Sequence, residues 1–191
     1  NSSFGALQPV NSAPANYVHD AALSDTCQAF YDVVMWTNTT PDINRYNDTI
    51  RFTQELSNYY AYDDGSAEWG YSLNSTGAKL AVRYDMPSGD SLRAVRFYFD
   101  PIFSTDDPTD GNFLLTVWSS LTPETIIHQN FTYDSPQYLP WGPNYFVEYP
   151  LDSTIWVPAT FYVGWTQTNT IKMNLGLDKN RDNSDRIFYK T

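Results

Sequence analysis

The chain has 191 residues, with 22 acidic against 11 basic side chains and a formal charge of −11. This excess of negative charge repels phosphate backbones and anionic lipids, so it excludes nucleic acid and acidic membrane surfaces as partners. No apolar stretch approaches the roughly 18 residues that a membrane-spanning helix needs, which argues against membrane insertion.

Residues 1–57 differ in character from the rest of the chain. They begin as a small, polar, Pro-containing stretch with one predicted short helix starting at Ser24, and they continue into two predicted strands, 31–36 and 48–56. We expect this part to be a linker or the remnant of an upstream, Ig-like module. Because the chain starts at Asn1 without a Met, we also expect a processed or excised piece of a longer polypeptide.

Residues 58–191 show strand signals throughout. Short runs rich in β-branched and aromatic residues are separated by turns that contain Pro, Gly, Asp and Asn. The segment 78–84 is apolar at every second position, and Val95, Phe97 and Phe99 share one face of the next predicted strand. Together with an aromatic content of 17%, this pattern predicts an all-β fold, an antiparallel β-sandwich of jelly-roll type.

Two acidic clusters stand at the start and at the end of the predicted sandwich, in "YDDGSAE" and "GLDKNRD". In carbohydrate-binding jelly rolls the first and last strands lie side by side, so the two clusters are placed to meet around a hard cation with oxygen ligands. The alternative is that both are turns whose side chains bond their own backbone. No cofactor is required by such a fold. The candidate ligands of a structural Ca²⁺ are Asp63, Asp64, Glu68, Asp178, Asn180 and Asp182.

Catalytic motifs are absent from the sequence, which contains no G-x-S-x-G, H-E-x-x-H or phosphate-binding loop. A glycosidase needs two carboxyls of different pKa about 5–10 Å apart, and the sequence singles out no such pair. A third acidic loop with Asp106, Asp107 and Asp110 is a weaker cation candidate. We therefore do not expect an enzyme, and a glycoside-acting domain is the most distant alternative.

The segment "YLPWGPNYF" is the best candidate for ligand binding. Its Pro and Gly residues stiffen a loop that presents Trp141 with Tyr138 and Tyr145 beside it. Rigidly held rings stack on the apolar faces of sugars, which predicts a glycan site at these three residues. The alternative is that Trp141 folds back and plugs the open end of the sandwich.

The runs "YYAYDDGSAE", "FYVGWTQT" and "LGLDKNRDNSDRIFY" resemble, in this order, a β-sandwich domain of large secreted and cell-surface proteins of Bacteroidetes. The resemblance covers about residues 48–191. It implies a secreted accessory module that precedes a C-terminal sorting domain for the type IX secretion system. No sorting domain follows here, so we expect a fragment. The implied partners are neighbouring domains of the same polypeptide and the secretion machinery.

The resemblance also implies O-glycans at Asp-Ser/Thr followed by an apolar residue or Thr, which makes Thr49, Ser91 and Ser153 candidate acceptors. Triplets of the N-x-S/T type, which a eukaryotic secretory cell glycosylates, start at Asn1, Asn38, Asn47, Asn74 and Asn130. The expected function is a non-catalytic extracellular module for adhesion, spacing or presentation. The main alternative is a carbohydrate-binding module with loop aromatics and a structural calcium.

Overall fold

The computed structural model of the chain describes residues 29–36, 49–101, 110–138 and 144–191. The chain divides into two compact units, residues 1–60 and 61–191, whereas the sequence placed the boundary after residue 57. The short helix predicted at Ser24 lies outside the described residues.

The first unit contains one antiparallel strand pair, β1 (Ala29–Trp36) and β2 (Thr49–Leu56). Its register runs from Ala29 opposite Leu56 to Trp36 opposite Thr49. The directly opposed Asp32 and Thr53 are joined by a hydrogen bond of 2.7 Å from Thr53 Oγ1 to Asp32 Oδ1. The two strands predicted in this part are therefore present.

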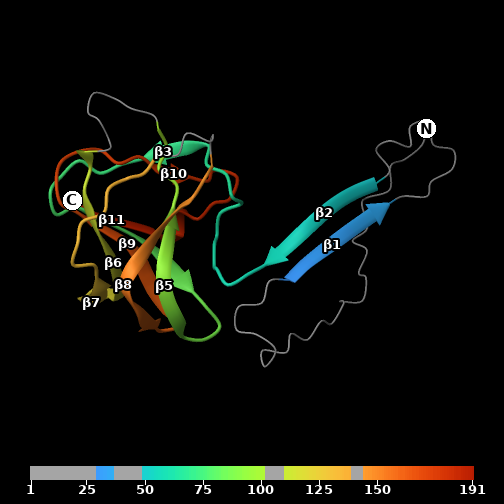
Figure 1. Cartoon of the computed structure of the whole chain (residues 1–191), viewed down its shortest axis with the longest axis horizontal. Coiled ribbons are helices and arrows are strands. Elements are labelled where there is room, and N and C mark those ends of the chain that lie inside the picture. The colour runs from blue at the N-terminus through green and yellow to red at the C-terminus, as the bar shows by residue number, and fades with distance from the viewer. Residues whose placement is uncertain (1–28, 37–48, 102–109, 139–143) are drawn as a thin grey trace. The chain divides into compact units, whose positions relative to one another are not determined.

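The second unit is built from short strands in two layers (Figure 1). The strands are β3 (Trp69–Tyr71), β4 (Lys79–Asp85), β5 (Asp90–Phe97), β6 (Phe113–Leu121), β7 (Glu124–Gln129), β8 (Val147–Val157), β9 (Thr160–Gln167), β10 (Leu175–Leu177) and β11 (Ile187–Lys190), with a 3₁₀ turn, η3 (Ser184–Arg186), before the last. Every strand pairing is antiparallel.

The strand order identifies the topology. One layer is a five-stranded sheet in the order β11-β4-β9-β6-β7. The other layer consists of the pairs β8-β5 and β10-β3, which meet through a bridge between Phe99 and Leu175 and so give the order β8-β5-β10-β3. Apart from the β6-β7 hairpin, successive strands alternate between the layers, as in a jelly roll. The predicted fold class is confirmed.

The core between the layers is filled by interlocking aromatic rings. Phe97, Phe99, Phe113, Tyr149 and Trp165 are all buried, and neighbouring ring centroids among them lie 5.4 to 6.1 Å apart. Edge-on and tilted contacts at this spacing stabilise beyond the area that they bury. The core thus comes from the alternating inward positions that the sequence predicts.

Trp118 is as deeply buried as Trp165 but lies on the opposite side of the sheet. It stands opposite Tyr162, whereas the preceding Val117 points into the core opposite Val163. The indole Nε1–H of Trp118 donates to Glu124 Oε1 at 3.1 Å. Phe113, Leu115 and Val117 point into the core, so alternation along β6 places Trp118 on the outer face of the sheet.

Candidate metal site and the adjoining groove

The two acidic loops meet because β3 and β10 are neighbours. Trp69 at the start of β3 pairs with Leu177 at the end of β10, so the loop before β3 and the loop after β10 leave from the same end (Figure 1). The backbone N–H of Asp64 donates to Asp178 Oδ2 at 3.0 Å, and the N–H of Lys179 donates to Glu68 Oε2 at 2.8 Å. The predicted side-by-side arrangement of the clusters is therefore present.

Three carboxylates converge at this junction. One oxygen from each of Asp64, Glu68 and Asp178 lies within 4.8 Å of the other two. Asn180 Nδ2 donates to Asp64 Oδ2 at 3.1 Å and to Glu68 Oε1 at 3.0 Å. The hydroxyl of Ser66 lies 2.6 Å from Asp64 Oδ1 and 2.8 Å from Glu68 Oε1. We call Asp64, Glu68, Asp178 and Asn180 the acidic junction.

Hydrogen bonding favours the charged form of Asp64 in the acidic junction. The bond from the Ser66 hydroxyl, followed by that from Asn180, holds the pKa of Asp64 below its usual value. Ca²⁺ takes six to eight oxygen ligands, of which these three carboxylates would supply the charged ones. If the Asn180 amide turned over, it would present its oxygen instead of its nitrogen to the same place. The junction therefore has the donor chemistry of a calcium site.

Two of the predicted ligands lie outside the junction. Asp63 Oδ1 accepts the backbone N–H of Gly65 at 3.0 Å, and Gly65 has the positive φ of 86° that such a tight turn needs. Asp182 Oδ1 accepts from the backbone N–H and the hydroxyl of Ser184 at 3.1 and 2.7 Å. These two carboxylates follow the turn interpretation. Asp64 combines both interpretations, because its Oδ1 accepts the backbone N–H of Ser66 at 3.0 Å and its Oδ2 accepts Asn180 Nδ2 from the other loop.

The predicted aromatic site is described in part. Trp141 lies outside the described residues, as do Asp106 and Asp107 of the third acidic loop. The half-buried Tyr138 packs edge-on against the core residue Phe99, with ring centroids 6.4 Å apart, so its ring is not a surface platform. Tyr145 is exposed, as its predicted role requires.

The ring of Trp69 is exposed but makes a cation–π contact within the protein. It is 61% exposed, but the ammonium of Lys179 lies 4.5 Å from its ring centroid. This cation–π contact joins the same two loops as the acidic junction. The candidate O-glycan acceptors Thr49, Ser91 and Ser153 are exposed and lie in β2, β5 and β8.

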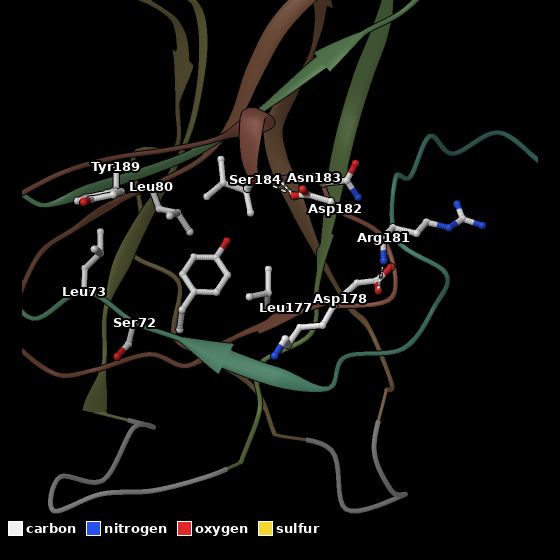
Figure 2. A pocket seen from close by; sticks show the side chains of 13 residues that line it. Ser72, Leu73, Leu80, Leu177, Asp178, Arg181, Asp182, Asn183, Ser184 and Tyr189 are labelled. Carbon is white, nitrogen blue, oxygen red and sulfur yellow. Dashed lines mark hydrogen bonds between the residues drawn. The ribbon is translucent and has the colours of Figure 1, made fainter.

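A groove adjoins the acidic junction (Figure 2). It has a volume of about 610 Å³ and runs between the end of β3, the loop after β10, and strands β4 and β11. In Figure 2 the side chains of Leu73, Leu80 and Leu177 point toward the hollow from three different elements. The sequence analysis missed this groove, because its walls are residues that were assigned either to the core or to turns.

Fold and site together define a jelly-roll β-sandwich whose paired strands β3 and β10 are tied at one end by two acidic loops. Comparisons with protein-family models, with curated proteins and with solved structures found no match to the chain. Among the described residues, no helix has the length and the apolar character that a membrane crossing requires.

Proposed function

We propose that the chain is a non-catalytic β-sandwich module of a larger secreted or cell-surface protein, where it serves adhesion, spacing or presentation. The observation that carries this proposal is the pair of hydrogen bonds between the loop before β3 and the loop after β10, from Asp64 to Asp178 and from Lys179 to Glu68. A module within a surface polypeptide experiences mechanical tension through its N-terminal and C-terminal ends. Bonds that join the loop before β3, near the start of the second unit, to the loop after β10, near its end, oppose such a load.

The extracellular location and the partners rest on the resemblance carried by "YYAYDDGSAE" and "LGLDKNRDNSDRIFY". It points to neighbouring domains of the same polypeptide, and to secretion machinery reached through a sorting domain, as the contacts of this module. The strongly negative net charge agrees with an extracellular module and disfavours nucleic acid as a partner, because phosphate groups would be repelled.

The chemistry of the acidic junction supports a non-catalytic role. A glycosidase acid has its pKa raised by an apolar setting, whereas the pKa of Asp64 is lowered by its hydrogen bonds. Glu68 and Asp178 accept backbone N–H groups of the facing loop, so these carboxylates help to hold the two loops together.

Two measurements test the proposal. In single-molecule pulling from both termini, Asp178→Ala should lower the force at which residues 61–191 unfold, and Asp182→Ala, in the same loop, should not. Incubation with a panel of plant and microbial polysaccharides should release no reducing ends. Hydrolysis that disappears on substitution of one carboxylate would overturn the non-catalytic assignment.

A second candidate function, a carbohydrate-binding module with a structural calcium, is favoured by the convergence of the three carboxylates within 4.8 Å. Calcium chloride alone should then raise the melting temperature, and EDTA should reverse the rise. A ligand at 100-fold excess over its Kd adds about 2.7 kcal/mol to the free energy of unfolding. Asp64→Asn should abolish the response and Asp182→Asn should retain it. An identical melting temperature in calcium and in EDTA would remove the cation from this proposal.

A further inference from the structure

The groove beside the acidic junction is open because the two layers differ in width. The five-stranded layer ends in β11, one strand beyond β4, while the other layer ends in β3. Ile187 and Tyr189 lie opposite Val82 and Leu80 of β4, and both line the groove. Tyr189 is 73% exposed. Its ring is thus available on the wall of a hollow rather than covered by the facing sheet.

The floor of the groove is apolar and its rim is polar. Leu73, Leu80 and Leu177 form the floor, and Leu73 and Leu80 are themselves part of the buried core. In Figure 2, Asp182 and Ser184 lie along the edge of the hollow, and Arg181 extends outward from it. A mainly apolar cleft with a few polar groups, in the range of about 300–1,000 Å³, is the usual form of a small-ligand site.

The half-buried Tyr71 provides a polar group in the wall. Its ring packs against the core, and its hydroxyl has no hydrogen-bond partner among the residues that the structure describes. Burial, with a smaller contribution from Tyr84, raises the pKa of Tyr71, so the phenol remains a neutral hydrogen-bond donor. A ligand hydroxyl is a suitable acceptor for that proton.

The charge of the rim selects for a neutral ligand. Two cationic side chains, Lys179 and Arg181, line the groove together with two anionic ones, Asp178 and Asp182, so their formal charges cancel. The rest of the chain is strongly acidic. An anionic ligand would meet repulsion from the protein as a whole, and the groove lining, which has no net formal charge, suits a neutral ligand.

We propose that this groove binds neutral sugar units of a glycan, with the Tyr189 ring against an apolar sugar face and the Tyr71 hydroxyl on a sugar hydroxyl. The proposal rests on the adhesive role proposed above and gives it a ligand class. It places glycan binding between β3 and β11, at residues other than the predicted Tyr138, Trp141 and Tyr145. One wall is the loop that carries Asp178, so the groove and the acidic junction share a structural element.

The test uses the full chain, ¹⁵N-labelled, titrated with neutral trisaccharides of glucose, mannose, galactose or xylose. At least one of them should shift amide signals of residues 71–73, 177–184 and 187–189. Tyr189→Ala should weaken its binding about tenfold through the lost stacking, and Tyr71→Phe about fivefold through the lost hydrogen bond. Tyr133→Ala is the matched control, because Tyr133 is also an exposed tyrosine and does not line the groove. It should leave the affinity unchanged.

Three results would overturn the proposal. The first is the absence of any shift with all four sugars at about 10 mM, a concentration that detects Kd values weaker than 1 mM. The second is a set of shifts confined to residues 138–146, which would return glycan binding to the Trp141 loop. The third is equal affinity in Tyr189→Ala and the unmodified chain, with both spectra well dispersed. In each case the single-molecule pulling experiment tests the proposed spacing role independently, because it does not depend on glycan binding.

Discussion

Asp64 and Asp178 stand 114 positions apart in the chain, and the backbone N–H of Asp64 donates to Asp178 Oδ2 at 3.0 Å. The other oxygen of the same carboxylate accepts the N–H groups of Asn180 and Arg181 at 2.7 and 3.2 Å. One side chain therefore shapes its own loop and also fastens the loop that precedes β3. Because this contact closes a long stretch of chain, its loss should be felt by the whole second unit.

We predict that Asp178→Ala lowers the free energy of unfolding by about 1–2 kcal/mol. Three backbone N–H groups lose a charged acceptor, and because the site is partly open to solvent, water replaces some of each bond. The measurement is urea-induced unfolding of the full chain, followed by tryptophan fluorescence. Asp182→Ala is the control, because its carboxylate binds Ser184 of its own turn, and it should cost less. Equal losses in the two variants would contradict a special role for Asp178.

Asp134 and Asp85 should respond to pH in opposite directions. Burial raises the pKa of Asp134, with a further contribution from Asp152, so the folded state holds its proton above the ordinary value of 3.8. Between pH 3.8 and the raised pKa of the folded state, Asp134 is ionised in the unfolded state but still protonated in the folded state. The free energy of unfolding therefore falls as the pH rises through this range. Asp134→Asn should remove this fall and should make the protein more stable than the unmodified chain at about pH 7, because an amide carries no charge to bury.

The hydrogen bond from Arg186 lowers the pKa of Asp85, which also binds Thr160 and Arg83. Its contribution is present above 3.8 and is lost as pH falls through the lower folded-state pKa. Asp85→Asn should therefore be destabilising near pH 7, and the difference should shrink in acid. Urea unfolding at several pH values measures both variants. Parallel pH profiles for Asp134→Asn and Asp85→Asn would contradict the opposite signs.

The fold could be predicted from the sequence because alternation reports directly on which face is buried. Val95, Phe97 and Phe99 were predicted to share a face, and Phe97 and Phe99 are buried with Val95 packed against them. Which acidic residues meet could not be predicted in the same way. Asp63 and Asp64 are adjacent, yet the Asp63 carboxylate accepts within its own turn, whereas Asp64 also accepts from Asn180 Nδ2 and donates its backbone N–H to Asp178.

The groove escaped prediction for a related reason. Leu80 lies in the alternating segment 78–84 and is buried as predicted, but the sequence analysis made no prediction for Leu73 or Tyr189. The hollow exists because one layer has a strand at its edge that the facing layer does not cover. The width of a sheet depends on which distant strands pair with one another. The alternation of apolar and polar residues within one strand does not predict that pairing.

Gly164 in β9 should not tolerate even a methyl group. A Cβ at this position would lie 1.9 Å from the carbonyl oxygen of Leu80 on the neighbouring strand, and backbone cannot move aside as a flexible side chain can. We expect Gly164→Ala to cost at least about 3 kcal/mol or to prevent folding, since it forces two central strands apart. Gly77→Ala is the control: it has open space around the added group but a positive φ of 81°, and should cost about 1 kcal/mol. Circular dichroism during thermal unfolding compares the two, and equal melting temperatures would contradict the close approach of β4 and β9.

Two N-x-S/T triplets within the described residues differ in solvent exposure, so they should also differ in N-glycosylation. Asn74 is exposed, whereas Asn130 is 5% exposed. Asn130 Nδ2 donates to the Pro150 carbonyl at 3.0 Å, and its Oδ1 accepts the N–H of Asp152 at 3.2 Å. A glycan attached at that nitrogen would have to open this part of the structure, and it would leave buried polar groups without partners.

When the chain is secreted from a eukaryotic host, we therefore expect a glycan at Asn74 and none at Asn130 in the folded product. Peptide mass spectrometry of the secreted protein reads each site separately, and Asn74→Gln should remove the modification at the first site without loss of fold. Chains that are modified at Asn130 before they fold should be retained in the cell, because burial of Asn130 is part of the native packing between β7 and β8. A secreted, cooperatively unfolding fraction that carries a glycan at Asn130 would contradict the buried position of this side chain.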